Sequence, residues 1–142
     1  MIRRIEKEFE MTDTLSNHTY DKNTRMLMFT YKNCLNVQLH LKLEFPFRPP
    51  ENLHINGRKI YYNNIGNRQS LVKYFNVQCL CCESIICPNN WKCTYRFEKL
   101  IEEYEIFKTM ARSSLVLHHL EKNHIAPTEI LHIIARFCGD KL

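Results

Sequence analysis

Residues 37–45 read VQLHLKLEF, and residues 46–50 read PFRPP. In the first stretch apolar side chains alternate with polar ones, which is the period of a strand that buries one face. Three prolines among the next five residues end the strand, because proline has no N–H to donate to a sheet and disfavours helix in the residue before it. The pattern predicts an antiparallel strand over 37–45, paired in a hairpin with residues 25–32, and then a stiff extended loop.

The segments on either side extend this pattern. Apolar residues recur at helical spacing among charged ones in residues 2–11, which predicts a short amphipathic helix. A polar stretch, residues 12–24, separates this helix from the hairpin. Beyond the proline-rich loop, residues 53–55 are a short strand candidate, and Asn56-Gly57 is a turn signal.

The carboxy-terminal part of the sequence is helical in pattern. A helix is predicted from residue 94 onward, and residues 113–123 form a second helical segment. Pro127 begins a third helix, which ends at Gly139. The apolar stripe that we expect to pack in this third helix comprises Ile130, Ile133, Ile134 and Phe137.

The order of these elements predicts the fold class. An amino-terminal helix, an antiparallel β-meander, an irregular cysteine-bearing segment and carboxy-terminal helices follow one another, which is typical of an α+β protein. A chain of 142 residues can close one hydrophobic core. We therefore expect a single domain over residues 1–142, with its core in 1–110 and carboxy-terminal helices in 111–142.

Composition and charge limit the classes of function. Twenty Lys and Arg against fifteen Asp and Glu give a formal charge of +5, which is too small and too evenly spread to predict a nucleic-acid surface. The first ten residues, MIRRIEKEFE, lack the apolar core of a secretory signal. No stretch approaches the roughly 18 consecutive apolar residues of a membrane span. We expect an intracellular protein, cytoplasmic or nuclear, with no membrane partner.

Cysteines gather in residues 79–93, CLCCESIICPNNWKC, which hold five of the chain's seven cysteines and its only tryptophan. In a reducing compartment such a cluster indicates metal binding or thiol chemistry rather than a disulfide framework. Four of these cysteines could supply thiolates to a tetrahedral zinc, as in the small zinc knuckles that bind single-stranded nucleic acid. This alternative zinc set is Cys79, Cys82, Cys87 and Cys93. The segment contains no glycine for the tight turns of a knuckle, so thiol chemistry stays open beside it.

Two short motifs that lie far apart in the sequence, and the order of the helices, resemble those of the ubiquitin-conjugating (UBC-like) enzymes. FPFRPP, residues 45–50, stands at the end of an alternating strand and is similar to the family signature F/Y-P-F-K-P-P. CESIICPNNWK, residues 82–92, is similar to the family's active-site segment, in which a cysteine precedes a short apolar stretch and a tryptophan. The amino-terminal helix and the later helices fall in the family's order. The clustered cysteines resemble the divergent members encoded by large DNA viruses, which implies a viral protein acting in its host cell.

The resemblance implies a set of catalytic residues. Cys82 aligns with the cysteine that forms a thioester with ubiquitin, and Cys79 is the competing alignment because it keeps the family's Cys-Leu pair. KIYYNNI, residues 59–65, lines up with the family's I-Y-H-P-N-I. This alignment places Asn64 on the asparagine that stabilises the oxyanion.

The resemblance also implies partner-binding residues. Phe47 takes the position of the loop aromatic that ubiquitin ligases contact, and Trp91 takes that of the family tryptophan. The helix face on which the family docks its activating enzyme corresponds to Arg3, Arg4 and Lys7.

The implied function is a transferase without a cofactor. It accepts ubiquitin, or a ubiquitin-like protein, as a cysteine thioester and passes it to a lysine, with an activating enzyme and a ubiquitin ligase as partners. Two alternatives stay open. Tyr62 and Asn63 replace the family's His and Pro, which favours a catalytically inactive variant that acts as a binding scaffold. The spaced cysteines favour a zinc-stapled binding module, with nucleic acid as a possible partner.

Overall fold

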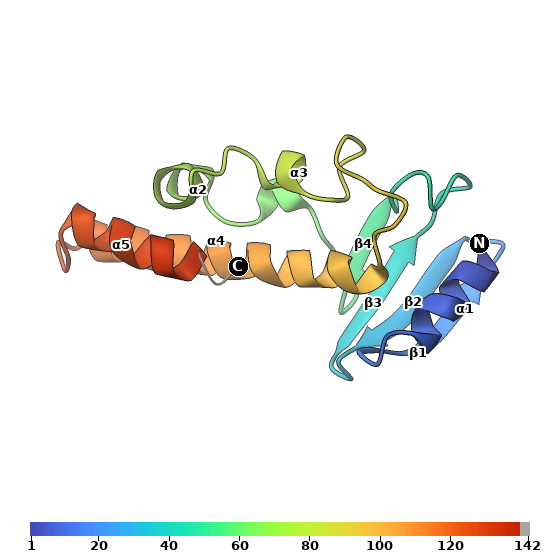
Figure 1. The fold of residues 1–142 in the computed structure, drawn as a ribbon. Coiled ribbons are helices and arrows are strands. Elements are labelled where there is room, and N and C mark those ends of the chain that lie inside the picture. Colours follow the sequence, from blue (N-terminus) through green and yellow to red (C-terminus); the bar gives the residue numbers. More distant parts are fainter. Residues whose placement is uncertain (140–142) are drawn as a thin grey trace. The chain divides into compact units, whose positions relative to one another are not determined.

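A short helix and an antiparallel meander form the front of the chain, as the sequence predicts (Figure 1). The computed structural model describes residues 1–139. The strands lie in the order β1-β2-β3-β4-β5, and each is antiparallel to its neighbours. The elements are α1 (Ile2–Glu10), β1 (Leu15–Asp21), β2 (Met26–Tyr31), β3 (Leu35–His40), β4 (Asn52–Ile55), β5 (Arg58–Lys59), the 3-10 helix η1 (Tyr62–Asn64), α2 (Arg68–Phe75), α3 (Leu80–Glu83), α4 (Phe97–Lys122) and α5 (Thr128–Gly139).

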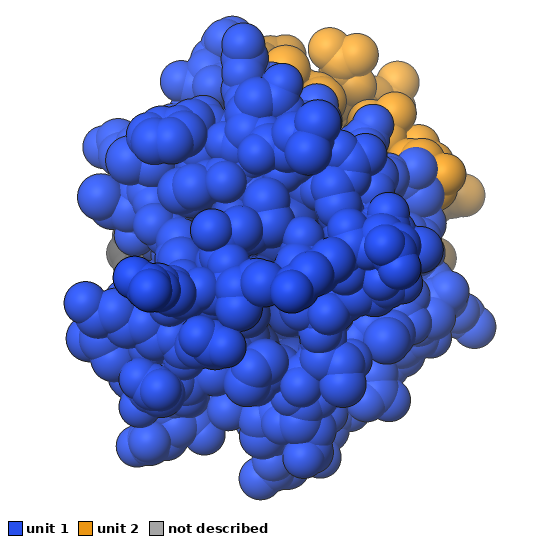
Figure 2. Space-filling view, turned by 90° about the vertical axis from the view of Figure 1, so that its right-hand side faces the viewer, with its two compact units in different colours: residues 1–60, 85–102 blue, residues 61–84, 103–142 orange. Residues whose placement is uncertain are grey.

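The chain divides into two structural units, which Figure 2 colours separately. Unit 1 comprises residues 1–60 and 85–102, and unit 2 comprises residues 61–84 and 103–142. Unit 1 therefore contains α1, the sheet and the proline-rich loop, and unit 2 contains η1, α2, α3 and α5. The helix α4 begins in unit 1 and continues into unit 2.

The hairpin predicted from the alternating pattern is formed by β2 and β3. The paired apolar residues on its buried face are Leu27, Phe29, Val37 and Leu39. The predicted strand over 37–45 is too long, because β3 ends at His40. Beyond it, the backbone N–H of Phe45 bonds to the carbonyl oxygen of Lys42 at 3.1 Å, in a turn rather than a ladder. The alternation continues into a segment that no longer has a partner strand.

The polar stretch 12–24 contains a strand, β1, that its sequence does not signal. A register shift between Ser16 and Thr19 interrupts its pairing with β2, and Leu15 is its one buried residue. β1 is the edge of the sheet, where bulges and exposed polar side chains are common. Such a strand has no need of strict alternation.

The short strand and turn predicted at 53–57 are confirmed. β4 pairs with β3, and its Leu53 lies opposite Leu39. Asn56 and Gly57 have φ angles of 49° and 75°. Positive φ at both central residues is what a two-residue hairpin turn of this type requires, and it leads the chain into β5.

Four phenylalanines from separate segments form the centre of unit 1. The ring of Phe97 lies 5.7 Å from that of Phe45 and 6.0 Å from that of Phe29, measured between centroids. Phe9 of α1 adds a contact with Phe29 at 5.4 Å. Aromatic pairs at these separations stabilise a core beyond the area that they bury. The cluster joins α1, the sheet, the proline-rich loop and the start of α4.

Two polar side chains of α1 hold the segment that begins α4. The carboxylate of Glu8 accepts a hydrogen bond from the backbone N–H of Phe97, the first residue of that helix. One turn earlier, Arg4 donates from its guanidinium to the carbonyl oxygen of Tyr95 at 3.0 Å. Glu8 is buried, and this burial raises the pKa of its carboxyl group against the lowering effects of the Phe97 hydrogen bond and of Arg4.

The helix predicted from residue 94 and the segment predicted over 113–123 are one continuous helix, α4. The prediction of two segments was therefore wrong. No glycine or proline lies between its first and last residues. The hydroxyl of Ser114 bonds back to the carbonyl oxygen of Ala111 at 2.8 Å, so this polar residue is satisfied inside the helix.

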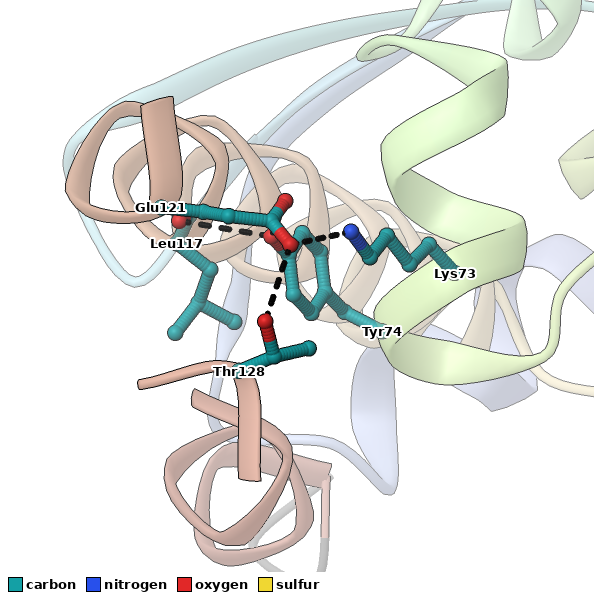
Figure 3. Close-up of polar contacts among 5 residues, drawn as sticks. All are labelled: Lys73, Tyr74, Leu117, Glu121 and Thr128. Atoms are coloured by element: carbon teal, nitrogen blue, oxygen red, sulfur yellow. Dashed lines mark hydrogen bonds and ion pairs between the residues drawn. The ribbon is translucent and has the colours of Figure 1, made fainter. Parts of the chain in front are cut away.

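In unit 2, α2, α4 and α5 meet at the carboxylate of Glu121 (Figure 3). Tyr74 of α2 donates its hydroxyl hydrogen to Glu121 at 2.7 Å, and Thr128 of α5 donates to the same carboxylate at 3.3 Å. Lys73 forms an ion pair with it. The hydrogen bond from Lys73, more than that from Tyr74, lowers the pKa of the Glu121 carboxyl to about 2.

The third predicted helix is confirmed as α5, but the prediction of its packed face was wrong. Its buried residues are Leu131, which is 0% exposed, and Ala135. They pack with Tyr74 and Leu117. The stripe predicted to pack is exposed, and it comprises Ile130, Ile133, Ile134 and Phe137. Both faces of this helix carry apolar residues, and the face with Leu131 and Ala135 is the buried one.

Within residues 1–139, the structure contains no helix with the length and apolar character that a membrane crossing needs.

The Glu8 contact predicts opposite results for two substitutions. Glu8→Ala removes the acceptor of the Phe97 N–H and should lower the free energy of unfolding by about 1–3 kcal/mol. Glu8→Gln keeps an acceptor and carries no charge. Because the folded-state pKa of Glu8 is raised, this group's contribution to stability falls as the pH rises from the unfolded value through the folded one. Denaturant unfolding at pH 7 should therefore find Glu8→Gln at least as stable as the wild type, and a loss as large as that of Glu8→Ala would contradict this account.

Candidate active site

The cysteine-bearing helix α3 is fixed from one side by two buried residues, Leu80 and Ser84. They are spaced four apart, and they are 2% and 0% exposed. The hydroxyl of Ser84 donates to the carboxylate of Glu103 on α4 at 2.5 Å. α3 also packs against η1. With Leu80 and Ser84 committed to the core, the intervening cysteines are left on the more exposed side of the turn.

Three thiols converge at this turn. The sulfur atoms of Cys79, Cys81 and Cys82 all lie within 4.8 Å of one another, and those of Cys81 and Cys82 are 3.8 Å apart. Cys82 is exposed, whereas the other two are half-buried. We call these three residues the thiol cluster. A single thiophilic ion such as zinc, which binds sulfur at about 2.3 Å, could be held by this set after small side-chain movements.

The thiols of the cluster differ in acidity. A hydrogen bond with the Cys81 thiol, followed by one from the Cys82 backbone N–H, lowers the pKa of Cys79 to about 7. The same contact with Cys79 raises the pKa of Cys81 to about 12. Thiolate is the reactive form of cysteine. Cys79 is therefore the thiol of this pair that ionises near neutral pH, and Cys81 stays protonated as its hydrogen-bond donor.

A pocket of about 340 Å³ opens beside the cluster within unit 2. Cys79 and Cys82 line it, together with polar residues of η1 and of the α2 region and several aliphatic side chains. The lining residues are Tyr62, Asn63, Ile65, Gly66, Arg68, Leu71, Val77, Gln78, Cys79, Leu80 and Cys82. Its volume is at the small end of the roughly 300–1,000 Å³ range of ligand sites.

The turn before α2 requires glycine on the pocket wall. Gly66 has a φ of +75°, and a Cβ added to it would lie 2.8 Å from the Cβ of Ala111 on α4. Any side chain here would therefore clash as well as strain the backbone. Asn67 then caps α2 by accepting a hydrogen bond from the Ser70 N–H at 3.1 Å. The close approach of this turn to α4 shapes one side of the pocket.

The segment that carries the predicted oxyanion residue lies against α3. Tyr62 is buried and its ring meets Phe107 of α4 edge to face, with centroids 5.5 Å apart. This packing anchors η1. Asn63 and Asn64 are both exposed, and of the two it is Asn63 that lines the pocket beside the cysteines. Sequence alignment favoured Asn64, and Asn63 is the pocket residue that it missed.

In unit 1, the two motifs of the resemblance are in contact. The indole N–H of Trp91 donates to the carbonyl oxygen of Pro46 at 2.7 Å, and its ring lies 6.1 Å from that of Phe45. Trp91 is half-buried, and its ring also meets Tyr95 at 5.8 Å. Phe47 of the same loop is 79% exposed. Trp91 thus holds the loop on its buried side, and the side chain of Phe47 is exposed to solvent.

The three basic residues predicted on the first helix have different surroundings. Arg3 and Lys7 are exposed. Arg4 is half-buried, because its guanidinium bonds to Tyr95 and lies 5.7 Å from the Phe45 ring centroid. Arg4 therefore helps to hold unit 1 together, and Arg3 and Lys7 are the basic side chains of α1 that are exposed.

The predicted zinc set is distributed over both units. Cys79 and Cys82 belong to unit 2, and Cys87 and Cys93 belong to unit 1. The structure instead adds Cys81 to the first pair. The signal for Cys81 was present in the sequence as two consecutive cysteines. Spacing alone does not predict that Cys81 groups with Cys79 and Cys82, because the turn that brings the three sulfur atoms together is too short to carry a periodic pattern.

Comparisons with protein-family models, with curated proteins and with solved structures find no match for this chain.

The acidity of Cys79 predicts a distinctive alkylation profile. The rate of Cys79 alkylation by iodoacetamide should reach half its maximum near pH 7, and Cys81 should react last. At pH 7 the larger thiolate fraction, offset by lower nucleophilicity, should make Cys79 about threefold faster than an ordinary exposed thiol of pKa near 8.5. Peptide mass spectrometry can follow each residue, with the exposed Cys34 as the reference.

A variant of Cys81 tests whether its hydrogen bond, rather than the accessibility of Cys79, controls the alkylation of Cys79. Cys81→Ala removes the hydrogen bond that contributes most to the low pKa of Cys79, so the half-maximum for Cys79 should move to higher pH. An unchanged profile in Cys81→Ala, or faster alkylation of Cys81 than of Cys79 in the wild type, would contradict the assignment.

Proposed function

We propose that this protein is a ubiquitin-conjugating transferase that carries ubiquitin, or a ubiquitin-like protein, as a cysteine thioester and passes it to a lysine. The observation that carries the proposal is the contact of Trp91 with Pro46, 45 residues apart in sequence, with a 2.7 Å hydrogen bond. FPFRPP and the tryptophan-bearing segment were matched to the family separately. Their joining in unit 1 supports treating them as parts of one arrangement.

The fold order is a second support. A short helix, an antiparallel meander, a loop rich in proline, a cysteine segment and later helices follow one another. This is the order that the resemblance implies for the family. The interval between KIYYNNI and the cysteine segment is several residues longer here than is usual in the family, and α2 lies within it.

We assign the thioester to Cys79. The alignment puts Cys82 on the thioester-forming cysteine, but a nucleophile near neutral pH must be ionised, and the hydrogen bond with Cys81 lowers the pKa of Cys79 to about 7. At that pH about half of Cys79 is thiolate. Cys79 also keeps the Cys-Leu pair of the family and lines the pocket.

Acyl transfer at this site needs few protein groups. The Cys79 thiolate attacks the carbonyl carbon of the ubiquitin thioester on the activating enzyme, a new C–S bond forms, and the activating enzyme's thiolate leaves. A lysine amine then attacks the Cys79 thioester, and the Cys79 thiolate leaves in turn. Because the acyl group arrives activated, the site can work without a strong general base beside the cysteine.

An amide at the pocket would stabilise the oxyanion formed in each attack. Asn63 is the asparagine that lines the pocket with Cys79, and Asn64 is the one that the alignment indicates. One such donor contributes about 3–4 kcal/mol to transition-state stability in an enzyme where it has been removed. We assign this role to Asn63 on the ground of its position.

The proposed partner surfaces lie on unit 1. Phe47 projects from a loop fixed by Trp91, which suits recognition by a ubiquitin ligase because an exposed aromatic on a rigid loop loses little entropy on binding. Arg3 and Lys7 would meet acidic groups of the activating enzyme. Both partners and ubiquitin act inside cells, so the proposed activity belongs to the cytoplasm or nucleus, in a host cell if the chain is viral.

The thiol cluster favours one alternative, a zinc-stapled binding module. Three sulfurs within 4.8 Å of one another could bind a soft ion. Zinc measured by elemental analysis of the purified chain separates this alternative from acyl transfer at Cys79. An inactive scaffold of the same fold is the other alternative, and it would bind partners through Phe47 while failing to take up ubiquitin.

A charging assay tests the proposal. The purified chain is incubated with ubiquitin, activating enzyme and ATP, and its intact mass is measured before and after treatment with a thiol reductant. We expect an adduct of one ubiquitin that the reductant removes. Cys79→Ser should form either no adduct or an oxygen ester that survives the reductant, because serine replaces the thiol with a hydroxyl.

Matched cysteine variants complete the assay. Cys93→Ser and Cys34→Ser, which alter exposed thiols of unit 1, should charge as the wild type does. Charging that persists as a thioester in Cys79→Ser and disappears in Cys82→Ser would move the nucleophile to Cys82. Absence of an adduct in the wild type, under conditions that charge a known conjugating enzyme, would contradict the proposed function.

A further inference from the structure

The first turn of α3 places two cysteines at disulfide-forming distance. The backbone N–H of Cys82 bonds to the carbonyl oxygen of Cys79 at 3.1 Å, which closes a turn from the first residue to the fourth. Such a turn holds its end Cα atoms less than about 7 Å apart, and disulfides form at Cα separations of about 4.4–6.8 Å. The sulfur atoms of both residues already lie within 4.8 Å of each other.

The other pairs within the cluster are less suited to a bond. Cys81 and Cys82 are consecutive, and a trans peptide fixes their Cα atoms about 3.8 Å apart, below the range of ordinary disulfides. The turn from Cys79 to Cys82 is closed by a backbone hydrogen bond that keeps the Cα separation near the range of ordinary disulfides. Cys79 and Cys82 are thus the pair that the backbone geometry favours.

We propose that Cys79 and Cys82 form a reversible disulfide when a hydroperoxide reaches the thiol cluster. Cys79 lines a pocket and Cys82 is exposed, so both a small oxidant and a reducing thiol have access to the pair. Exposed thiols that have a low pKa and a second cysteine beside them are the usual sites of such oxidation.

The oxidation proceeds in two balanced steps. The Cys79 thiolate attacks one oxygen of the hydroperoxide: an S–O bond forms, the O–O bond breaks, and the departing alkoxide takes a proton to become an alcohol. Cys79 is then a sulfenic acid. The Cys82 sulfur attacks the Cys79 sulfur: the S–S bond forms, the S–O bond breaks, and hydroxide leaves with the Cys82 proton as water. Two thiols lose two electrons, and the hydroperoxide gains them.

The disulfide has a consequence that rests on the proposed function. If Cys79 carries the ubiquitin thioester, its oxidation removes the nucleophile, and reduction restores it. The transferase would then be switched off by peroxide and on by cellular thiols.

Differential alkylation tests the disulfide with the full reduced chain and hydrogen peroxide alone. Free thiols are blocked with light iodoacetamide, the chain is reduced, and newly released thiols are labelled with heavy iodoacetamide. We expect the heavy label on Cys79 and Cys82 and the light label on Cys81. Before any alkylation, the intact mass of the oxidised chain should be lower than that of the untreated chain by the mass of two hydrogen atoms.

Variants decide which pair reacts. Cys81→Ser should retain the mass loss, whereas Cys79→Ser and Cys82→Ser should abolish it. Heavy label on Cys81 in the wild type would overturn the assigned pair. Gain of oxygen atoms in place of the loss of hydrogen, a disulfide-linked dimer, or the absence of heavy label would overturn the proposal.

The regulatory consequence has a separate readout. Oxidised chain, freed of peroxide by desalting, should fail to charge with ubiquitin, and chain that is reduced and desalted should charge. Equal charging of both samples would overturn the regulatory role. The alkylation result needs neither ubiquitin nor activating enzyme, so failure of the reduced chain to charge would count against the proposed function while the disulfide stands on its own measurement.

Discussion

A buried carboxylate on the first helix, Glu8, accepts a hydrogen bond from the backbone N–H of Phe97, where α4 begins. One turn away, Arg4 bonds to the carbonyl oxygen of Tyr95. The unpaired N–H groups at the start of a helix need acceptors, and a carboxylate is among the strongest available. These contacts attach the second segment of unit 1, residues 85–102, to the amino-terminal helix. Glu8 therefore satisfies a backbone N–H at the first residue of α4.

The rest of unit 1 follows from this attachment. With Phe97 held in place, its ring packs against Phe45 at the start of the proline-rich loop. Trp91 lies on the same segment and bonds to Pro46. Phe47 remains exposed next to this fixed point. The aromatic and polar contacts together hold this loop against the core of unit 1 and leave Phe47 exposed.

Unit 2 holds the thiol cluster on the short helix α3. Its helices α2, α4 and α5 meet at Glu121 and around the core formed by Tyr74, Leu117 and Leu131 (Figure 3). The short helix α3 is anchored through Leu80 and Ser84. This anchoring leaves the three cysteines of the thiol cluster close together on the more exposed side of the turn. Three sulfurs share hydrogen bonds, and the sharing makes Cys79 more acidic and Cys81 less acidic.

The sequence predicts an element best where one of its faces is apolar and buried and the other is polar and exposed to solvent. The alternation of β3 and the helical spacing of α1 predicted both elements, because burial on one side imposes a period. β1 escaped prediction because its side chains are mostly exposed. The packed face of α5 was misassigned because both of its faces are apolar, so that periodicity alone cannot choose between them.

The candidate site was predictable in its residue types but not in its grouping. Spacing indicated Cys79 and Cys82, and it gave no means to see that Cys81 would supply a hydrogen bond to Cys79. Asn63 and Asn64 are neighbours in sequence, and only the packing of Tyr62 into the core decides which of them lines the pocket. Contacts of this kind depend on tertiary structure and have no local signature.

Discharge of ubiquitin to free lysine is the most direct test of the central claim, that a thiol of this cluster transfers an acyl group. Chain charged with ubiquitin is separated from activating enzyme and ATP, and the thioester is followed over time with and without lysine. The account predicts that lysine speeds the loss of the thioester, and that a ubiquitin-lysine product appears at the same rate. A thioester that forms but decays equally in both samples, with no such product, would contradict it.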